Sequence, residues 1–149
     1  MSNNFQKISQ LENQIKSLID TNETLQLQVE KEYPVDIDYD KAMANWSGNT
    51  AEGVDIICSF GDKWKDEMNK YYSLLYNDLN SDKRKWLKSS QKKWETFIKD
   101  NEELEWQTYD QINGEGSIMQ IYSAQIYLDR YRDRTITLMD LYDFLHEEN

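Results

Sequence analysis

The stretch 64–97 constrains the fold most, because large apolar residues recur in it at helical spacing. The stripe in its first half consists of Trp64, Met68, Tyr71, Tyr72, Leu75 and Leu79. The stripe in its second half consists of Leu87, Trp94, Phe97 and Ile98, with the amide of Gln91 on the same side. Offsets of three and four place such residues on one face of an α-helix. Asn80-Ser81-Asp82 lies between the stripes and offers side chains that cap helix starts. So short a connection predicts an antiparallel αα-hairpin.

Composition extends this helical prediction to the whole chain. One Pro and five Gly in 149 residues leave little turn chemistry for a fold of many strands. Five Trp and ten Tyr supply large rings for a core. We therefore predict an all-α helical bundle built on the hairpin 64–97, closed by a long helix over 118–145, with an extra N-terminal helix. Residues 33–149 are expected to form one compact unit, and residues 1–32 the amphipathic N-terminal helix.

The predicted last helix follows a glycine turn. Gly114 and Gly116 mark the turn, and Ser117 is the expected N-cap. Its core stripe consists of Ile121, Ala124, Leu128, Tyr131, Thr135, Leu138, Tyr142 and Leu145. Arg134 falls close to this stripe, so we expect it to be a buried or half-buried ion-pair partner.

The segment 32–62 is the least regular part. Pro34 is expected to end the first helix. Asp36, Asp38 and Asp40 alternate as in a calcium loop, but Lys41 and Ser47 occupy the positions where such a loop needs Gly and Glu. We interpret these aspartates as N-caps of a short helix through 42–46. A turn over 47–49 and a second short helix over 50–60, which Gly61 ends, complete the segment.

The N-terminal segment carries a heptad pattern. Its seam consists of Ile8, Leu11, Ile15, Leu18, Asn22, Leu25 and Val29, at alternating spacings of three and four. β-branched residues and one Asn at a, with Leu at d, are typical of a parallel homodimer. The flanking e and g positions hold mostly Gln, Thr and Ile, and about three heptads make a marginal coiled coil. The alternative is a helix that packs on its own domain and leaves Asn22 at a solvated edge.

The net charge of −11, from 28 acidic and 17 basic residues, disfavours nucleic-acid binding. It is compatible with a cationic protein partner, and also with a role in solubility alone. One basic cluster stands out, in the second hairpin helix. Its members Lys85, Lys88 and Lys92 share a face, which either meets a protein partner or pairs with acidic helices of the same chain.

Catalytic groups are scarce. Cys58 is the single cysteine, so no internal disulfide and no cysteine-based zinc site can form. His146 is the single histidine and lies at a terminus expected to fray, which argues against a Cys58-His146 pair. The carboxylates Glu102, Glu103, Glu105 and Asp110 could serve as acid and base, although a solvated helix face explains them as well. We predict no enzyme, no metal and no cofactor.

The hydropathy pattern bears on location. The polar start of the chain contains no apolar signal region, and no stretch approaches a membrane span. We expect a cytoplasmic protein with no membrane partner. If a signal peptide has been removed from this sequence, the expected location is periplasmic or secreted instead.

Several short motifs, in this order, resemble the DUF1311 family, also called the lysozyme inhibitor LprI N-terminal-like domain. They are Met68-Asn69-Lys70-Tyr71, Gln91 with Trp94 and Phe97, Gly116-Ser117-Ile118, and Arg134-Thr135 with Leu138. The resemblance covers about Thr50 to Leu145 and leaves the N-terminal helix outside. It implies a helical domain whose signature positions, mostly structural, are Asn69, Tyr71, Gln91, Trp94, Gly116, Ser117 and Arg134.

The chain also departs from this family. Family members are typically exported and carry cysteines at positions that correspond to about Glu102 and Ile126 here. The absence of both cysteines fits a reducing compartment. Cys58 lies near a third position where the family often has cysteine.

These observations together predict a non-enzymatic, protein-binding helical domain. One alternative is an inhibitor or immunity protein directed against a lysozyme-like or other toxin hydrolase, and another is a small enzyme that depends on carboxylates. Asn69 and Gln91 lie on or beside an apolar stripe and need hydrogen-bond partners. They are expected either to face each other across the hairpin or to line a binding pocket.

Overall fold

The computed structural model describes residues 2–29, 32–113 and 116–147, and all regular structure in these ranges is helical. The chain divides into two compact units, residues 1–37 and 38–149. The helices are α1 (Ser2–Val29), α2 (Pro34–Ala44), α3 (Thr50–Asp78), α4 (Arg84–Gln111) and α5 (Ser117–His146). The prediction of an all-α helical bundle is therefore confirmed. Within the described ranges, no helix has both the length and the apolar character needed to cross a membrane.

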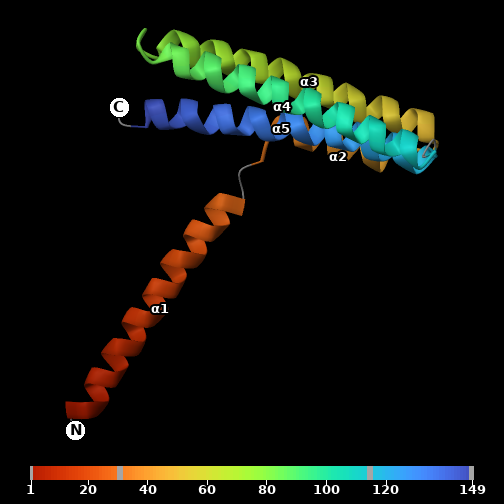
Figure 1. Ribbon diagram of the computed structural model, residues 1–149. Helices are drawn as coiled ribbons and strands as arrows, with labels where there is room; N and C mark the ends of the chain where they lie inside the picture. Colours follow the sequence, from red (N-terminus) through yellow and green to blue (C-terminus); the bar gives the residue numbers. More distant parts are fainter. Residues whose placement is uncertain (1, 30–31, 114–115, 148–149) are drawn as a thin grey trace. The chain divides into compact units, whose positions relative to one another are not determined.

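The larger unit is a bundle in which α3, α4 and α5 lie side by side along their lengths (Figure 1). The closest approach of two helices in the bundle is between α3 and α5. The two helices of the hairpin, α3 and α4, approach each other less closely, although the prediction placed the hairpin at the centre of the bundle. Two buried glycines of α3 allow this approach. A Cβ at Gly61 would lie 2.5 Å from the ring of Tyr127, and a Cβ at Gly53 would lie 3.0 Å from Ile121.

Two features of α3 depart from the prediction. The short helix over 50–60 does not end at Gly61 but continues to Asp78. The glycine serves helix packing instead of helix termination, because α5 leaves no room for a side chain there. The predicted turn over 47–49 precedes α3: Gly48 has φ +87°, and the Asn49 side chain accepts a hydrogen bond from the Glu52 amide at 3.0 Å.

The core follows the predicted stripes closely. Trp64, Met68 and Leu75 of α3, Leu87 of α4, and Leu138 of α5 are buried. Thr135 is wholly buried as well, and its hydroxyl oxygen lies 2.9 Å from the carbonyl oxygen of Trp64 and 2.6 Å from that of Tyr131, so its single proton is shared between the two acceptors. Pairs of rings pack edge to face around the core: Tyr71 with Tyr142, and Trp94 with Tyr131. Phe97 does not belong to the stripe, because 62% of it is exposed, and Leu145 is also exposed.

The remaining corrections concern helix ends. Pro34 begins α2, and α1 ends before it at Val29. Asp36 lies in the first turn of α2, while Asp38 and Asp40 lie inside the helix and not at its N-cap as predicted. The predicted capping residues 80–82 do not cap α4 but form a turn before it. The N-cap position of α4 is Lys83, whose side chain makes no capping hydrogen bond. At α5 the N-cap is Gly116, and Ser117 is the first helical residue.

The C-terminal helix holds its last turn to α3. His146 Nε2 lies 2.9 Å from Asp78 Oδ2, and His146 Nδ1 lies 2.7 Å from the carbonyl oxygen of Tyr142. The imidazole also packs on the Tyr142 ring, at 4.1 Å between centroids. The expectation that His146 lies on a frayed end is therefore wrong.

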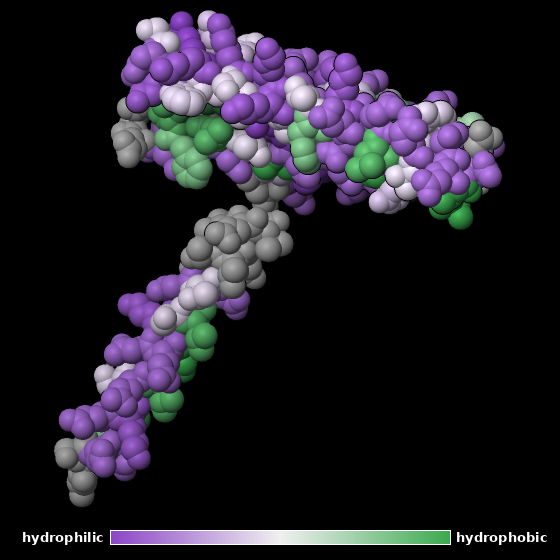
Figure 2. Space-filling view, in the orientation of Figure 1, coloured by the Kyte–Doolittle hydropathy of each residue, from purple (hydrophilic) through white to green (hydrophobic). Residues whose placement is uncertain are grey.

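The second half of α2 packs on the same bundle. The Tyr39 hydroxyl donates to Gln125 Oε1 at 3.0 Å, and the Tyr39 ring packs edge to face on Phe60. In the smaller unit, α1 shows hydrophobic side chains along one side and polar ones along the other (Figure 2). The side chains of Leu25 and Val29, which belong to the predicted seam, lie outside the described residues.

Candidate functional site

An apolar groove lies at one end of the bundle, where α3 and α5 end and α4 begins. We call it the end groove; its volume is about 510 Å³. Figure 2 shows hydrophobic side chains gathered at this end of the bundle. The lining residues are Leu75, Leu79, Lys83, Trp86, Leu87, Ser90, Arg134, Leu138, Leu141, Phe144 and Leu145.

Core and surface residues contribute different parts of the end groove. Its floor is the outer side of the buried core residues Leu75, Leu87 and Leu138. Its walls carry Trp86 of α4 and Phe144 of α5, which are 68% and 66% exposed. Exposed rings that border one apolar depression form a contiguous patch, and such patches mark interaction sites more often than single exposed rings do. The sequence pattern did not identify these two residues, because both lie off the helical stripes.

A polar cluster borders the end groove on the inner side. Arg134 Nε donates to Gln91 Oε1 at 2.9 Å, and Arg134 Nη2 donates to Ser90 Oγ at 3.1 Å. The Gln91 amide nitrogen in turn lies 3.6 Å from Met68 Sδ and 3.3 Å from Glu95 Oε1. Burial lowers the pKa of Arg134, and the charge of Glu95 acts in the opposite direction. This cluster joins α4 to α5, and it satisfies the buried Gln91 amide.

Basic side chains follow the first turns of α4, and they do not all face the end groove, because Lys88 lines a separate depression with Tyr72 and Tyr76. Lys83 lines the groove directly, and the Lys85 ammonium lies 5.3 Å from the centre of the Trp86 ring. The Lys88 ammonium lies 5.3 Å from the centre of the Tyr76 ring, and Lys92 is exposed one turn further on. The three lysines predicted as a partner surface are all accessible in the structure, and two of them stack on rings.

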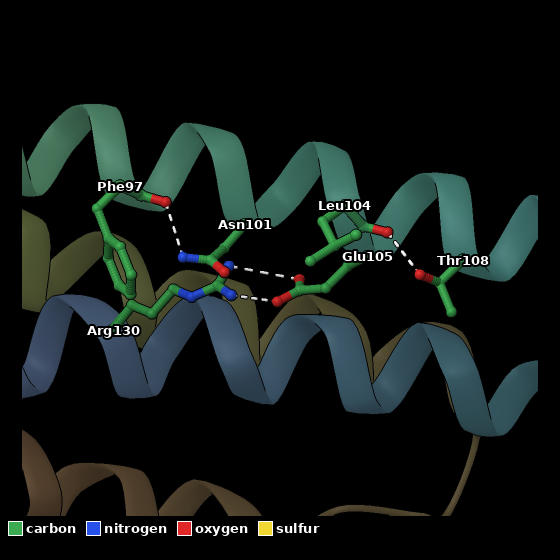
Figure 3. A network of polar contacts seen from close by, with 6 residues as sticks. All are labelled: Phe97, Asn101, Leu104, Glu105, Thr108 and Arg130. Atoms are coloured by element: carbon green, nitrogen blue, oxygen red, sulfur yellow. Dashed lines mark hydrogen bonds and ion pairs between the residues drawn. The ribbon is translucent and has the colours of Figure 1, made fainter.

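A second polar network joins the other half of α4 to α5. Arg130 and Glu105 form an ion pair, and the Arg130 Nη1 to Glu105 Oε2 distance is 3.4 Å (Figure 3). On the same face of α4, the Asn101 amide donates to the carbonyl oxygen of Phe97 at 2.8 Å, and the Thr108 hydroxyl donates to that of Leu104 at 2.7 Å. These bonds stay within the helix, so Arg130 and Glu105 provide the link between helices.

In the comparison with protein families, the chain matches the Lysozyme inhibitor LprI family over residues 42–138. This span runs from the end of α2 into α5 and covers more than half of the chain. The chain belongs to the lysozyme inhibitor LprI family. Comparisons with curated proteins and with solved structures found no match. The resemblance noted in the sequence is thereby confirmed, and α1 lies outside the matched LprI region.

The structure brings together only some of the predicted LprI signature positions. Gln91, Trp94 and Arg134 form one cluster, in which the Arg134 guanidinium lies 5.8 Å from the centre of the Trp94 ring. Asn69 is exposed on the solvent side of α3. Its backbone carbonyl oxygen accepts a hydrogen bond from the Ser73 hydroxyl. Tyr71 packs on Tyr142, and Gly116 and Ser117 are exposed at the start of α5.

The buried Gln91 and the exposed Asn69 therefore have different environments. Gln91 is bonded to Arg134, Glu95 and Met68. These amides were expected either to face each other across the hairpin or to line a binding pocket, and Asn69 does neither. Gln91 lies beside the end groove, and its amide has hydrogen-bond partners there.

Of the groups considered for catalysis, only Glu102 and Glu105 line a common depression among the described residues. Glu105 is paired with Arg130, and Glu103 accepts a hydrogen bond from Gln107. Glu102 and Glu105 line a smaller depression of about 240 Å³ together with Trp106 and Tyr109. Burial raises the pKa of the Cys58 thiol, and the charges of Asp62 and Asp55 add to this, so Cys58 is a poor nucleophile. Within the described residues, no group of three or more His, Cys, Asp or Glu is arranged to hold a metal ion.

Proposed function

We propose that the chain is a non-enzymatic protein-binding domain and that the end groove is its contact surface. The observation that carries this proposal is an open apolar groove of about 510 Å³ whose walls are the exposed rings of Trp86 and Phe144. Exposed aromatic residues around an apolar depression are typical of the residues that dominate binding energy at protein interfaces.

The charge on α4 indicates the chemistry of the partner. The first turns of α4 carry Lys85 and Lys88, and its last turns carry Glu105 and Asp110, with no acidic residue in the first turn and no basic residue in the last. This order opposes the helix macrodipole, at a cost of about 0.3–1 kcal/mol for a charge in a terminal turn. Helix stability therefore does not explain the basic cluster, whereas a partner of opposite charge does. We infer that the end groove receives an amphipathic segment with apolar residues on one face and acidic residues beside them.

A designed peptide tests this proposal. The probe is a fluorescent amphipathic peptide with leucines at helical spacing and flanking glutamates; its counterpart carries lysines instead. We expect the acidic peptide to bind more tightly, and Trp86→Ala to weaken its binding about tenfold or more, the effect of losing a binding hot spot. Trp106→Ala is the matched control, because Trp106 is a similarly exposed tryptophan on the same helix but away from the groove. Equal binding of both peptides, or no effect of Trp86→Ala, would refute the groove as this contact surface.

A second candidate function is inhibition of a lysozyme-like or other toxin hydrolase. The match to the Lysozyme inhibitor LprI family supports it, together with the net charge of −11, which suits a cationic enzyme. The test is lysozyme activity with the full chain at low and at high salt. Inhibition that weakens at high salt supports contact through acidic residues. Unchanged lysozyme activity at low salt rejects this candidate.

Two further expectations stay predictions. A carboxylate-dependent enzyme draws little support from the geometry, since Glu105 is already paired with Arg130. Turnover of a polysaccharide substrate that disappears in Glu102→Gln would support the enzyme hypothesis.

The expected cytoplasmic location conflicts with inhibition of an exported hydrolase. Cell fractionation distinguishes a cytoplasmic from an exported protein.

A further inference from the structure

Helix α1 carries a continuous apolar stripe that is open to solvent. Ile8, Leu11, Ile15 and Leu18 are each more than half exposed, and Figure 2 shows hydrophobic residues along one side of this helix. A single amphipathic helix gains most of its stability from the packing of such a stripe. The length and the exposed stripe of α1 therefore indicate a packing partner.

The spacing of the stripe identifies the kind of partner. Residues alternate at three and four positions, which is the 3.5-residue period of a supercoiled pair. The a positions hold the β-branched Ile8 and Ile15, and the d positions hold Leu11 and Leu18. This choice favours two parallel strands over three or four. We propose that α1 pairs with α1 of a second copy of this chain, as a parallel and in-register coiled coil.

Polar residues of α1 fix the register and the orientation. Asn22 occupies an a position, where in a parallel, in-register pair it meets Asn22 of the second copy and exchanges a hydrogen bond with it. Lys7 occupies a g position and Glu12 the e position five residues later, and both are exposed. In a parallel pair Lys7 of each copy faces Glu12 of the other, so the attraction occurs twice. An antiparallel pair would place g beside g and e beside e, and both attractions would be lost.

This pairing goes beyond the proposed function. The match to the LprI family begins at residue 42, after α1 has ended at Val29. The end groove is built only from residues 75–145, so pairing through α1 leaves its residues available. Failure of one proposal therefore leaves the other standing.

The mass of the full chain in solution tests the pairing. Sedimentation equilibrium is expected to give twice the chain mass of 17.9 kDa at high concentration, with dissociation on dilution. The double variant Leu11→Asp, Leu18→Asp is expected to give the single-chain mass throughout. Ile118→Asp is the control, because Ile118 is an 81% exposed isoleucine on α5, and this variant should still dimerise. A single-chain mass for the unmodified protein at every concentration, or a dimer that survives the double variant, overturns the proposal.

Crosslinking tests the orientation. In a Cys58→Ser background, Ile8→Cys places one thiol in each copy at the same level of a parallel seam. Mild oxidation is then expected to give a disulfide-linked dimer that reducing agent dissociates. Lys7→Glu should weaken dimerisation, and Lys7→Glu combined with Glu12→Lys should restore it. The absence of a crosslink, or the absence of restoration, overturns the parallel and in-register arrangement.

Discussion

Gly61 lies in the middle of α3, where helix propensity alone favours alanine by about 1 kcal/mol. A methyl group there would lie 2.5 Å from Tyr127 Cε1 and 3.4 Å from Leu128 Cα. We therefore expect Gly61→Ala to lower the free energy of unfolding by about 1–3 kcal/mol, as overpacking does. Urea denaturation measures this. In a Tyr127→Ala background the same change should no longer destabilise; a similar loss in both backgrounds would show that the Tyr127 ring is not the cause.

Because of Tyr127, the stability of the bundle is expected to change with pH in the alkaline range. Burial raises the pKa of Tyr127 above the ordinary 10.0, and its hydrogen bond to Asp62 at 2.5 Å adds to this. The folded state then holds the phenol proton more tightly than the unfolded state, so this stabilisation is complete below pH 10 and is lost as pH rises above it. Unfolding free energies measured from neutral pH to beyond pH 10 should fall less steeply for Tyr127→Phe than for the unmodified chain. Tyr122→Phe, at an exposed tyrosine, should leave the slope unchanged.

At the scale of elements, α4 depends on polar contacts more than its neighbours do. It buries Leu87, Gln91 and Ile98, and two arginines of α5 bind it, Arg134 through Gln91 and Arg130 through Glu105. We expect α4 amides to exchange with solvent faster than those of α3. Arg134→Lys should accelerate exchange in α4 selectively, because an ammonium cannot replace the two donors of the guanidinium fork. Equal acceleration in α3, the internal reference, would argue against a local role for Arg134.

The periodicity of the sequence predicted the inner faces of α3 and α5, since a buried stripe must repeat at helical spacing. It could not predict that α3 continues through Gly61. A glycine in the sequence is equally compatible with the end of a helix and with the close packing of two helices. It failed for Phe97, whose offset from Trp94 fits a helix face that no neighbouring helix covers. The end groove was missed for a related reason: Trp86 and Phe144 come together only when α4 and α5 are placed side by side.

At the scale of the whole molecule, the division into residues 1–37 and 38–149 predicts separate stabilities. A chain that starts at Tyr33 should keep the thermal unfolding midpoint of the bundle when both are measured in dilute solution. It should also lose any dependence of that midpoint on protein concentration, because it lacks α1. Circular dichroism at several concentrations measures both. A midpoint that falls on removal of residues 1–32 would show that the bundle needs them.

The order of charges gives α4 a positive first half and a negative second half. Lys83 lines the end groove and Lys85 packs on its residue Trp86, while Glu102, Glu103 and Asp110 lie towards the other end of the same helix. For the acidic partner proposed above, lysines near the end groove would raise the rate of productive encounter before any atoms touch. Added salt should slow association while leaving dissociation nearly unchanged. The charges would then determine how quickly a complex forms, and the rings of Trp86 and Phe144 would determine how long it lasts.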